Sequence, residues 1–311
     1  MCSSDYKEIT SLVGSFYDLY PFPPEDELEA DLCLSDWRYS LKEVYCFFED
    51  VIGPCNHKTE RVRILDAGCG TGLSTNLLAR LNPGSEILAI DVSEISLSIA
   101  RKRRLKSKAS KASKASKASE ISFKNISLFD LSLDRDFDYI NTIGLINHIQ
   151  YPLDAFYKFR ELLKPGGILH VFAYSQNGRC QINLLSESFG DLGLKSTAKD
   201  IVLARELIEN LPKDNFLRID YQRRCKEGIL SDSRFADMYL HPLESSFNLD
   251  KLFGFIDEVN LEWIGFSDRE NWRLERLIAG EMLRKATNLP LRKRLRLIES
   301  LDQGINYFDF F

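Results

Sequence analysis

Hydrophobic positions change their spacing near residue 61, and this change predicts two kinds of structure along the chain. Before it, Leu41, Val44 and Phe48 recur at helical spacing, so we expect a buried helical face and a cap at Asp36. After it, short apolar runs alternate with amphipathic stretches. That alternation is typical of βαβ units built around a parallel sheet.

The alternating region predicts five strands with helices between them. We expect the strands at residues 63–66, 86–91, 121–130, 137–142 and 167–174. We expect the helices at 74–81, 94–106, near Leu145, and at 153–163. The sequence Lys-Pro-Gly-Gly at 164–167 predicts a turn that ends the last of these helices.

Four segments follow from this pattern. Residues 1–60 form a helical amino-terminal segment that can serve as a lid, and 61–175 form the α/β core. Residues 176–245 are polar and mostly helical, which indicates an insertion that also covers the substrate. Residues 246–311 complete the sheet, with a helix at 248–259, a strand at 261–266, a basic helical stretch at 273–299 and a final strand within 305–311.

Lys-Ala-Ser is repeated four times between Lys108 and Ser119. A period of three drifts around a helix and keeps no apolar face, so we interpret the repeat as a solvated helix extension or a disordered insertion. A basic docking arm is the alternative. Residues 101–117 hold nine basic residues, and the rest of the chain carries a formal charge of −14. An acidic body of this kind disfavours nucleic acid as a partner.

Composition excludes several other classes of protein. The apolar runs fall far short of the ~20 residues of a membrane span. The amino terminus has no basic segment leading into an apolar one, so we expect a cytoplasmic protein. The seven cysteines are scattered, without the close pairs of a disulfide framework or a thiolate zinc site. No cluster of side chains has metal-ligand spacing, so we predict no metal.

A glycine-rich turn carries the strongest chemical signal. In Leu65-Asp66-Ala67-Gly68-Cys69-Gly70-Thr71-Gly72 a strand ends, and a helix begins directly afterwards. Glycines let the backbone approach a ligand, and a helix N-terminus offers free N–H groups to an anion. The spacing G-x-G-x-G differs from the dinucleotide fingerprint G-x-G-x-x-G, because Leu73 stands at its third glycine position. A nicotinamide dehydrogenase is therefore disfavoured.

Two acidic residues follow the next strands. Asp91 ends the second strand, where a carboxylate can accept hydrogen bonds from both ribose hydroxyls of a nucleoside. A helix cap is the alternative role for Asp91, although Ser93 can supply that cap as well. Asp130 ends the third strand, where we expect it to accept from an adenine amino group, with a turn residue as the alternative.

Residues 61–174 resemble class I S-adenosylmethionine-dependent methyltransferases, in particular the group related to ubiquinone and menaquinone C-methyltransferases. The matching motifs are Leu-Asp-Ala-Gly-Cys-Gly-Thr-Gly, Ala-Ile-Asp-Val-Ser, Phe-Asp-Tyr-Ile and Leu-Leu-Lys-Pro-Gly-Gly-Ile-Leu. The resemblance implies a seven-stranded Rossmann-like sheet of order 3-2-1-4-5-7-6 whose last strand is antiparallel. It implies S-adenosyl-L-methionine as cofactor, with the binding residues Asp66, Gly68, Gly70, Gly72, Asp91, Val92 and Asp130.

The methyl acceptor and the catalytic residues are less defined. Methyl transfer mainly requires alignment of the acceptor, and a general base is needed only when the acceptor loses a proton. His148 follows the fourth strand and is a candidate base, with a structural histidine as an equal alternative. Tyr17 belongs to an aromatic segment that can close over the cofactor as a lid, with ordinary core packing as the alternative. We expect a small-molecule acceptor; a protein methyltransferase and a non-catalytic cofactor-binding protein remain the alternatives.

Overall fold

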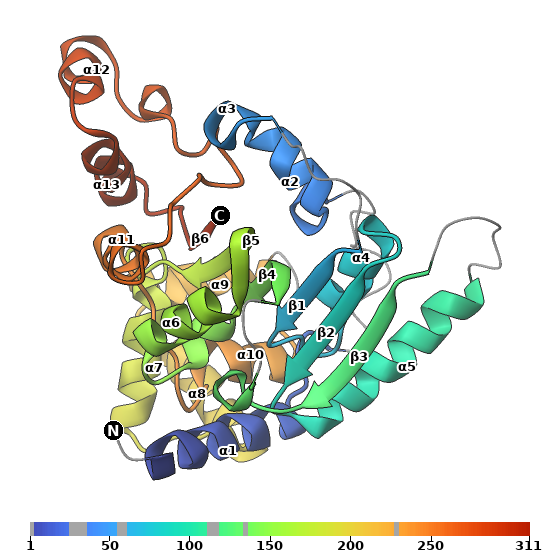
Figure 1. Ribbon diagram of the computed structural model, residues 1–311. Helices are drawn as coiled ribbons and strands as arrows, with labels where there is room; N and C mark the ends of the chain where they lie inside the picture. The colour runs from blue at the N-terminus through green and yellow to red at the C-terminus, as the bar shows by residue number, and fades with distance from the viewer. Residues whose placement is uncertain (1–2, 25–35, 55–60, 111–117, 133–135, 227–229) are drawn as a thin grey trace.

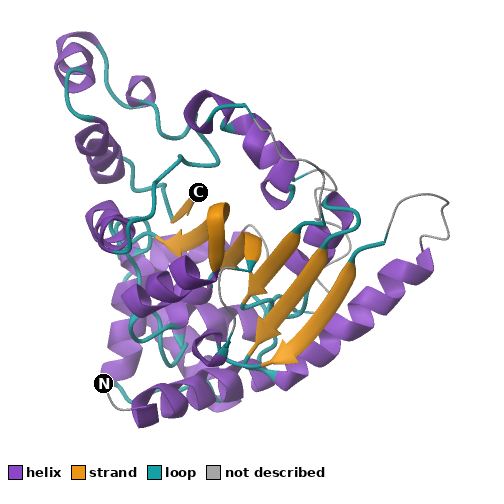
Figure 2. Ribbon diagram, in the orientation of Figure 1, coloured by secondary structure: helices purple, strands orange, loops and turns teal. Residues whose placement is uncertain are grey.

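The computed structural model describes residues 3–24, 36–54, 61–110, 118–132, 136–226 and 230–311. Within these ranges a six-stranded sheet has the order β3-β2-β1-β4-β5-β6, and helices surround it (Figure 2). The strands are β1 (Arg63–Ala67), β2 (Glu86–Asp91), β3 (Glu120–Asn125), β4 (Phe137–Ile143), β5 (Leu163–Tyr174) and β6 (Tyr307–Phe310). Strands β1 to β5 pair in parallel, and β6 pairs antiparallel with β5.

Most of the helices lie at or near the places that the hydrophobic spacing predicts. The helices before and within the core are α1 (Ser3–Leu19), α2 (Leu41–Phe47), α3 (Glu49–Ile52), α4 (Leu73–Leu81), α5 (Glu94–Ser110) and α6 (Pro152–Leu162). The insertion contains α7 (Cys180–Asp191), α8 (Ala198–Asn210), α9 (Phe216–Lys226) and α10 (Asp232–Tyr239). The last helices are α11 (Leu249–Glu258), α12 (Gly280–Thr287) and α13 (Leu291–Leu301).

The prediction of seven strands is wrong for the described part of the chain. The expected strand at 261–266 forms no regular ladder: Phe266 makes a single antiparallel bridge with Phe310 in β6. The indole of Trp263 packs against the rings of Phe253 and Phe266, at centroid distances of 5.6 and 5.3 Å. Backbone hydrogen bonds from residues 264–267 to Asp309 and Phe311 also hold this segment beside β6, although it forms no regular strand. The final strand is antiparallel beside β5, as predicted.

Two further predictions are corrected at the ends of elements. Asp36 accepts a hydrogen bond from the Arg38 N–H and caps a short 3-10 turn, whereas Ser40 caps α2 by accepting from the Glu43 N–H. Of the Lys-Ala-Ser repeat, residues 111–117 lie outside the described ranges, and α5 continues through Ser110. Ser119 ends the repeat and is buried. Its hydroxyl lies within hydrogen-bond distance of the carbonyl groups of Ala79 and Asn82, which satisfy it away from water. The solvated interpretation therefore does not extend to this last residue.

The amino-terminal helix lies across the carboxyl ends of the strands. In Figure 1 the arrowheads of β1, β2 and β3 point toward α1, which runs across that edge of the sheet. Phe16 of α1 is buried in the hydrophobic core of the insertion, together with side chains of α7, α8 and α10. At its carboxyl end Asp18 accepts hydrogen bonds from the Ser93 hydroxyl and the Ile95 N–H. Helix α1 is thus packed on the insertion and bound to the start of α5.

Candidate functional site

The turn between β1 and α4 brings backbone close to two other segments. Gly70 has φ +51°, and a Cβ atom there would lie 2.5 Å from the Phe22 carbonyl oxygen. Gly72 has φ +81°, and a Cβ atom there would lie 2.6 Å from the Ala100 methyl carbon. Any larger residue would clash, so the chain needs glycine at both positions. The turn is covered by the segment after α1, because Thr71 donates through its hydroxyl to the Pro23 carbonyl.

Asp66 supports this turn from beneath. Its buried carboxylate accepts hydrogen bonds from the Ser74 and Thr75 hydroxyls at 2.8 and 2.6 Å, and from the Asn141 amide at 2.8 Å. Burial raises its pKa, and these donors oppose that rise. Asp66 does not line the cavity described below, so it reaches a ligand only through the turn that it holds.

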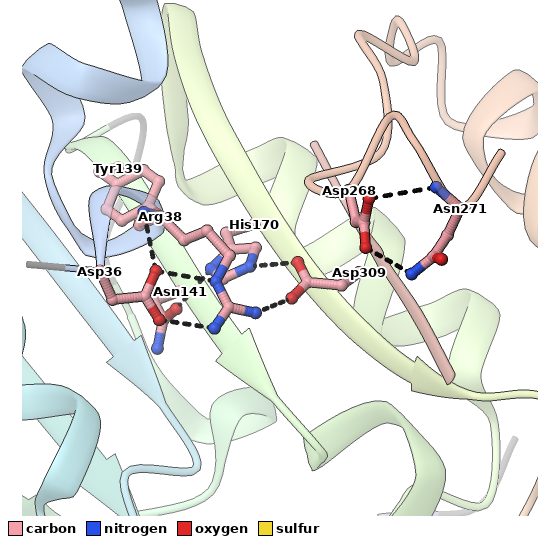
Figure 3. Close-up of polar contacts among 8 residues, drawn as sticks. All are labelled: Asp36, Arg38, Tyr139, Asn141, His170, Asp268, Asn271 and Asp309. Atoms are coloured by element: carbon pink, nitrogen blue, oxygen red, sulfur yellow. Dashed lines mark hydrogen bonds and ion pairs between the residues drawn. The ribbon is translucent and has the colours of Figure 1, made fainter. Parts of the chain in front are cut away.

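A row of polar side chains continues from Asp66 across the sheet. Figure 3 shows this row: Asn141 of β4 contacts His170 of β5, and His170 contacts Asp309 of β6. Asp309 in turn forms an ion pair with Arg38. Because the Asn141 amide nitrogen donates to Asp66, its oxygen accepts from His170 Nδ1 at 2.8 Å. His170 Nε2 faces an Asp309 carboxylate oxygen, also at 2.8 Å. Both nitrogens of this fully buried ring therefore face oxygen atoms at hydrogen-bond distance, which fixes the ring between β4 and β6.

Asp91 lies at the carboxyl end of β2, with its side chain turned to the glycine-rich turn. Its carboxylate accepts from the Gly70 N–H at 2.8 Å and from the Ser93 N–H at 2.9 Å. Burial raises its pKa, and the backbone N–H groups of Ser93, Gly70 and Val92 oppose the rise. A carboxylate has about four lone-pair sites, so acceptor capacity remains for a hydroxyl group of a ligand. Ser93 itself caps α5, because its hydroxyl accepts from the Ser96 N–H at 3.0 Å, and the unused acceptor sites of Asp91 leave the ribose role available.

A cavity of about 410 Å³ lies between the turn, the strand ends and α1. This volume falls within the ~300–1,000 Å³ of small-molecule sites. Predicted cofactor residues that line it are Gly68, Gly70, Asp91 and Val92. On the side of β4 and β5 the lining includes His148, Tyr174 and Asp237, and α1 contributes Tyr6, Ile9, Thr10, Val13 and Tyr17.

Asp130 is not brought to this cavity. It lies in a 3-10 turn (Leu128–Asp130) and lines an adjoining hollow with Lys7 of α1. The preceding residues Leu128 and Phe129 line the cavity instead. The adenine role of Asp130 stays a prediction, and apolar contact with Phe129 offers a second way for this segment to hold a ring.

His148 ends the short helix after β4 (Leu145–His148) and lines the cavity. Its Nδ1 lies 2.9 Å from the Leu243 carbonyl oxygen, so Nδ1 carries the proton and Nε2 keeps a lone pair. Burial lowers the pKa of His148 to about 4, so the ring is neutral at pH 7. His241 lies against it, with ring centroids 4.0 Å apart. His241 comes from the insertion, so the two histidines that meet here are far apart in the sequence.

Tyr17 and the insertion complete the wall beside His148. The Tyr17 hydroxyl donates to Asp237 at 3.1 Å, and its ring centroid is 6.0 Å from that of His148. Burial raises the pKa of Asp237 to about 6, against the opposing effect of the Tyr17 hydrogen bond. Sequence reasoning missed Asp237 as a site residue. It stands in the segment Phe-Ala-Asp-Met-Tyr-Leu-His-Pro at 235–242, whose loose resemblance to bacterial relatives assigns no role to its residues.

Arg179 and Glu244 form a closed pair behind this wall. Arg179 Nη2 lies 2.7 Å from a Glu244 carboxylate oxygen, and its guanidinium lies 3.7 Å from the ring centroid of Tyr174. Neither member of the pair lines the cavity. Within the described ranges we find no group of three His, Cys, Asp or Glu side chains that could hold a metal ion. The same ranges contain no helix with the length and apolarity to cross a membrane.

Comparison with known proteins agrees with this geometry. Residues 65–169 match a family described as a methyltransferase domain. An uncharacterized protein of Synechococcus is 36% identical over 312 residues, covering 97% of this chain and 71% of the relative. The ubiquinone biosynthesis O-methyltransferase of Nitrosococcus oceani is 25% identical over 216 residues, covering 67% of this chain and 77% of the relative.

The fold resembles that of PKMT2 from Rickettsia typhi in complex with AdoHcy. The TM-score is 0.70 at 17% identity, and the alignment covers 88% of this chain and 53% of that structure. The chain therefore spans about half the length of that solved protein. At this identity the structural likeness shows the fold and does not identify the methyl acceptor.

Proposed function

We propose that this chain, which belongs to the class I S-adenosylmethionine-dependent methyltransferases, methylates a small molecule enclosed in the cavity between α1 and the strand ends. The enclosure by α1 is the observation that carries this proposal. Five residues of α1 line the cavity, and Phe16 fixes the helix to the core of the insertion. A lid over a mostly apolar cavity suits a small, ring-bearing acceptor better than a polypeptide.

The cofactor, when bound, supplies an activated methyl group on a sulfonium sulfur. We assign the ribose hydroxyls to the unused acceptor sites of Asp91, and the close backbone contacts to Gly68 and Gly70. Gly72 does not line the cavity, so its predicted cofactor role is limited to the close packing of the turn on Ala100 of α5. Val92 contributes apolar contact beside Asp91, since both line the cavity. Asp66 supports the turn without touching the ligand. The unprotonated Nε2 of His148 can accept a hydrogen bond and so orient an acceptor.

The acceptor class can be tested with methyl-labelled S-adenosylmethionine and a cell extract of Synechococcus, the source of the related protein. The extract is divided into a small-molecule fraction and a protein fraction, and each is incubated with the purified chain. We expect label in the small-molecule fraction only. The Asp91→Ala variant should transfer far less label, and Asp138→Ala should match the wild type, because Asp138 pairs with Lys164 away from the cavity. Label confined to polypeptides would contradict the proposal.

A further inference from the structure

Asp237 is a buried carboxylate in the wall of the cavity. It belongs to α10, whose residues Phe235, Ala236 and Tyr239 lie in the hydrophobic core of the insertion. Asp237 is 7% exposed, and it lines the cavity together with His148 and Tyr174. Burial of a carboxylate costs free energy unless hydrogen bonds or charges compensate it. Asp237 therefore needs hydrogen-bond donors or positive charges close to its carboxylate.

The charges of Arg179 and Arg234 favour the ionised form of this carboxylate, but hydrogen bonds from the described residues satisfy it only in part. Tyr17 donates one hydrogen bond to Oδ1 at 3.1 Å, whereas an ionised carboxylate can accept about four. Glu244, a neighbouring half-buried acid, is held by Arg179 at 2.7 Å. Asp237 differs from Glu244 because its carboxylate borders the cavity. The unused acceptor sites therefore face the space in which a methyl acceptor would lie.

We propose that Asp237 binds an O–H or N–H group of the methyl acceptor and takes its proton during methyl transfer. This inference rests on the proposed function and adds the chemical class of the acceptor. The acceptor oxygen or nitrogen forms a bond to the methyl carbon, while the carbon–sulfur bond breaks and its electron pair stays on sulfur. The acceptor's proton passes to the Asp237 carboxylate. The products are the methylated acceptor, S-adenosylhomocysteine and a neutral carboxylic acid, which then loses its proton to water.

The two candidate bases of the cavity differ in strength. Burial raises the pKa of Asp237 to about 6, whereas burial lowers that of His148 to about 4. A general base works best when its pKa lies near the operating pH. Asp237 is ionised at neutral pH and is the stronger base, so His148 is left to orient the acceptor through Nε2. Tyr17 acts through Asp237, as a positioning residue that fixes the carboxylate.

The test measures binding of matched probes to the protein loaded with S-adenosylhomocysteine, so that no turnover occurs. Catechol is compared with 1,2-dimethoxybenzene, and aniline with N,N-dimethylaniline, by calorimetry at pH 7.5. Because hydrogen bonds to charged groups are among the stronger ones, we expect the wild type to prefer at least one unmethylated probe by about tenfold or more. The two pairs distinguish an O–H acceptor from an N–H acceptor.

Two substitutions distinguish the contribution of Asp237 to probe binding from that of a neighbouring acid. Asp237→Asn should lose the preference, and Glu244→Gln should keep it, because Glu244 does not line the cavity. In the wild type the preference should fall as the pH drops through about 6, where Asp237 becomes protonated. This pH dependence is measured on the wild-type protein alone. Equal binding of both members of each pair, retention of the preference in Asp237→Asn, or no binding of any unmethylated probe would overturn the proposal. Failure of S-adenosylhomocysteine to bind would instead contradict the proposed function.

Discussion

His148 and His241 hydrogen-bond opposite backbone groups of the same residue, Leu243. His148 Nδ1 donates to the Leu243 carbonyl at 2.9 Å, and His241 Nδ1 accepts from the Leu243 N–H at 3.1 Å. The two neutral rings are therefore opposite tautomers, held with their centroids 4.0 Å apart. The pairing leaves a lone pair on Nε2 of His148 and a proton on Nε2 of His241. One loop thus sets the protonation pattern beside the proposed acceptor site.

This relationship predicts the nitrogen NMR spectrum of the two rings. Burial lowers the pKa of both histidines, to about 4 for His148. We expect one ring protonated on Nδ1 and the other on Nε2, with neither titrating between pH 5.5 and 8. His148→Gln and His241→Gln assign the signals. Two rings of the same tautomer, or titration of either ring near its ordinary pKa of about 6.5, would contradict the geometry.

Helix α1 should control the release of ligand from the cavity. Asp18 accepts hydrogen bonds from the Ser93 hydroxyl and the Ile95 N–H, which bind the end of α1 to the start of α5. If these hydrogen bonds contribute about 1 kcal/mol, their loss makes movement of α1 away from the cavity roughly fivefold faster. We therefore expect Asp18→Ala to speed dissociation of S-adenosylhomocysteine by about that factor in stopped-flow measurements. Glu8→Ala, on an exposed position of the same helix, is the control and should leave the rate unchanged.

Asp309 should stabilise the fold in a pH-dependent way. Burial alone would raise its pKa, but His170 and Arg38 lower it overall. A carboxyl whose pKa is lower in the folded state stabilises the protein at neutral pH, and this stabilisation is lost as the pH falls. Removing one partner of a buried ion pair costs roughly 3–5 kcal/mol, so we expect Asp309→Asn to lose about that much at pH 7.

Urea unfolding at several pH values measures this effect. The difference between the wild type and Asp309→Asn should be constant near neutral pH and should shrink below about pH 4, where an unfolded aspartate begins to bind protons. Asp257→Asn is the control, since Asp257 pairs with Arg292 at the exposed surface, where such pairs contribute about 0–1 kcal/mol. A difference that does not change with pH would show that Asp309 contributes packing alone.

Local sequence patterns predict the core of this fold well, because its determinants are local. Alternating apolar runs place β1, β2, β4 and β5, and the Gly68–Gly72 turn follows from backbone contacts that only glycine allows. The prediction of a regular strand fails at residues 261–266, where Ile264 and Gly265 hydrogen-bond to Phe311 but the rest of the segment packs through side chains such as Trp263. Apolar character alone does not distinguish these two outcomes.

The acceptor side of the site depends on long-range packing and is harder to predict. Asp237 and His241 come from the insertion, about 90 residues after His148, and tertiary packing brings the three side chains together. Their signal in the sequence is the motif Phe-Ala-Asp-Met-Tyr-Leu-His-Pro at 235–242, which resembles segments of bacterial relatives. The motif identifies the residues as a group but gives neither their distance to β4 nor the tautomers of the histidines.

The central claim is that the cavity beside Asp91 holds the cofactor, and calorimetric titration with S-adenosylhomocysteine tests it most directly. We expect binding to the wild type, affinity reduced by more than about tenfold in Asp91→Ala through loss of hydrogen bonds to a charged group, and unchanged affinity in Asp138→Ala. NADH should not bind, since Leu73 replaces the third glycine of the dinucleotide motif. No binding to the wild type, or equal affinity in Asp91→Ala, would contradict this account.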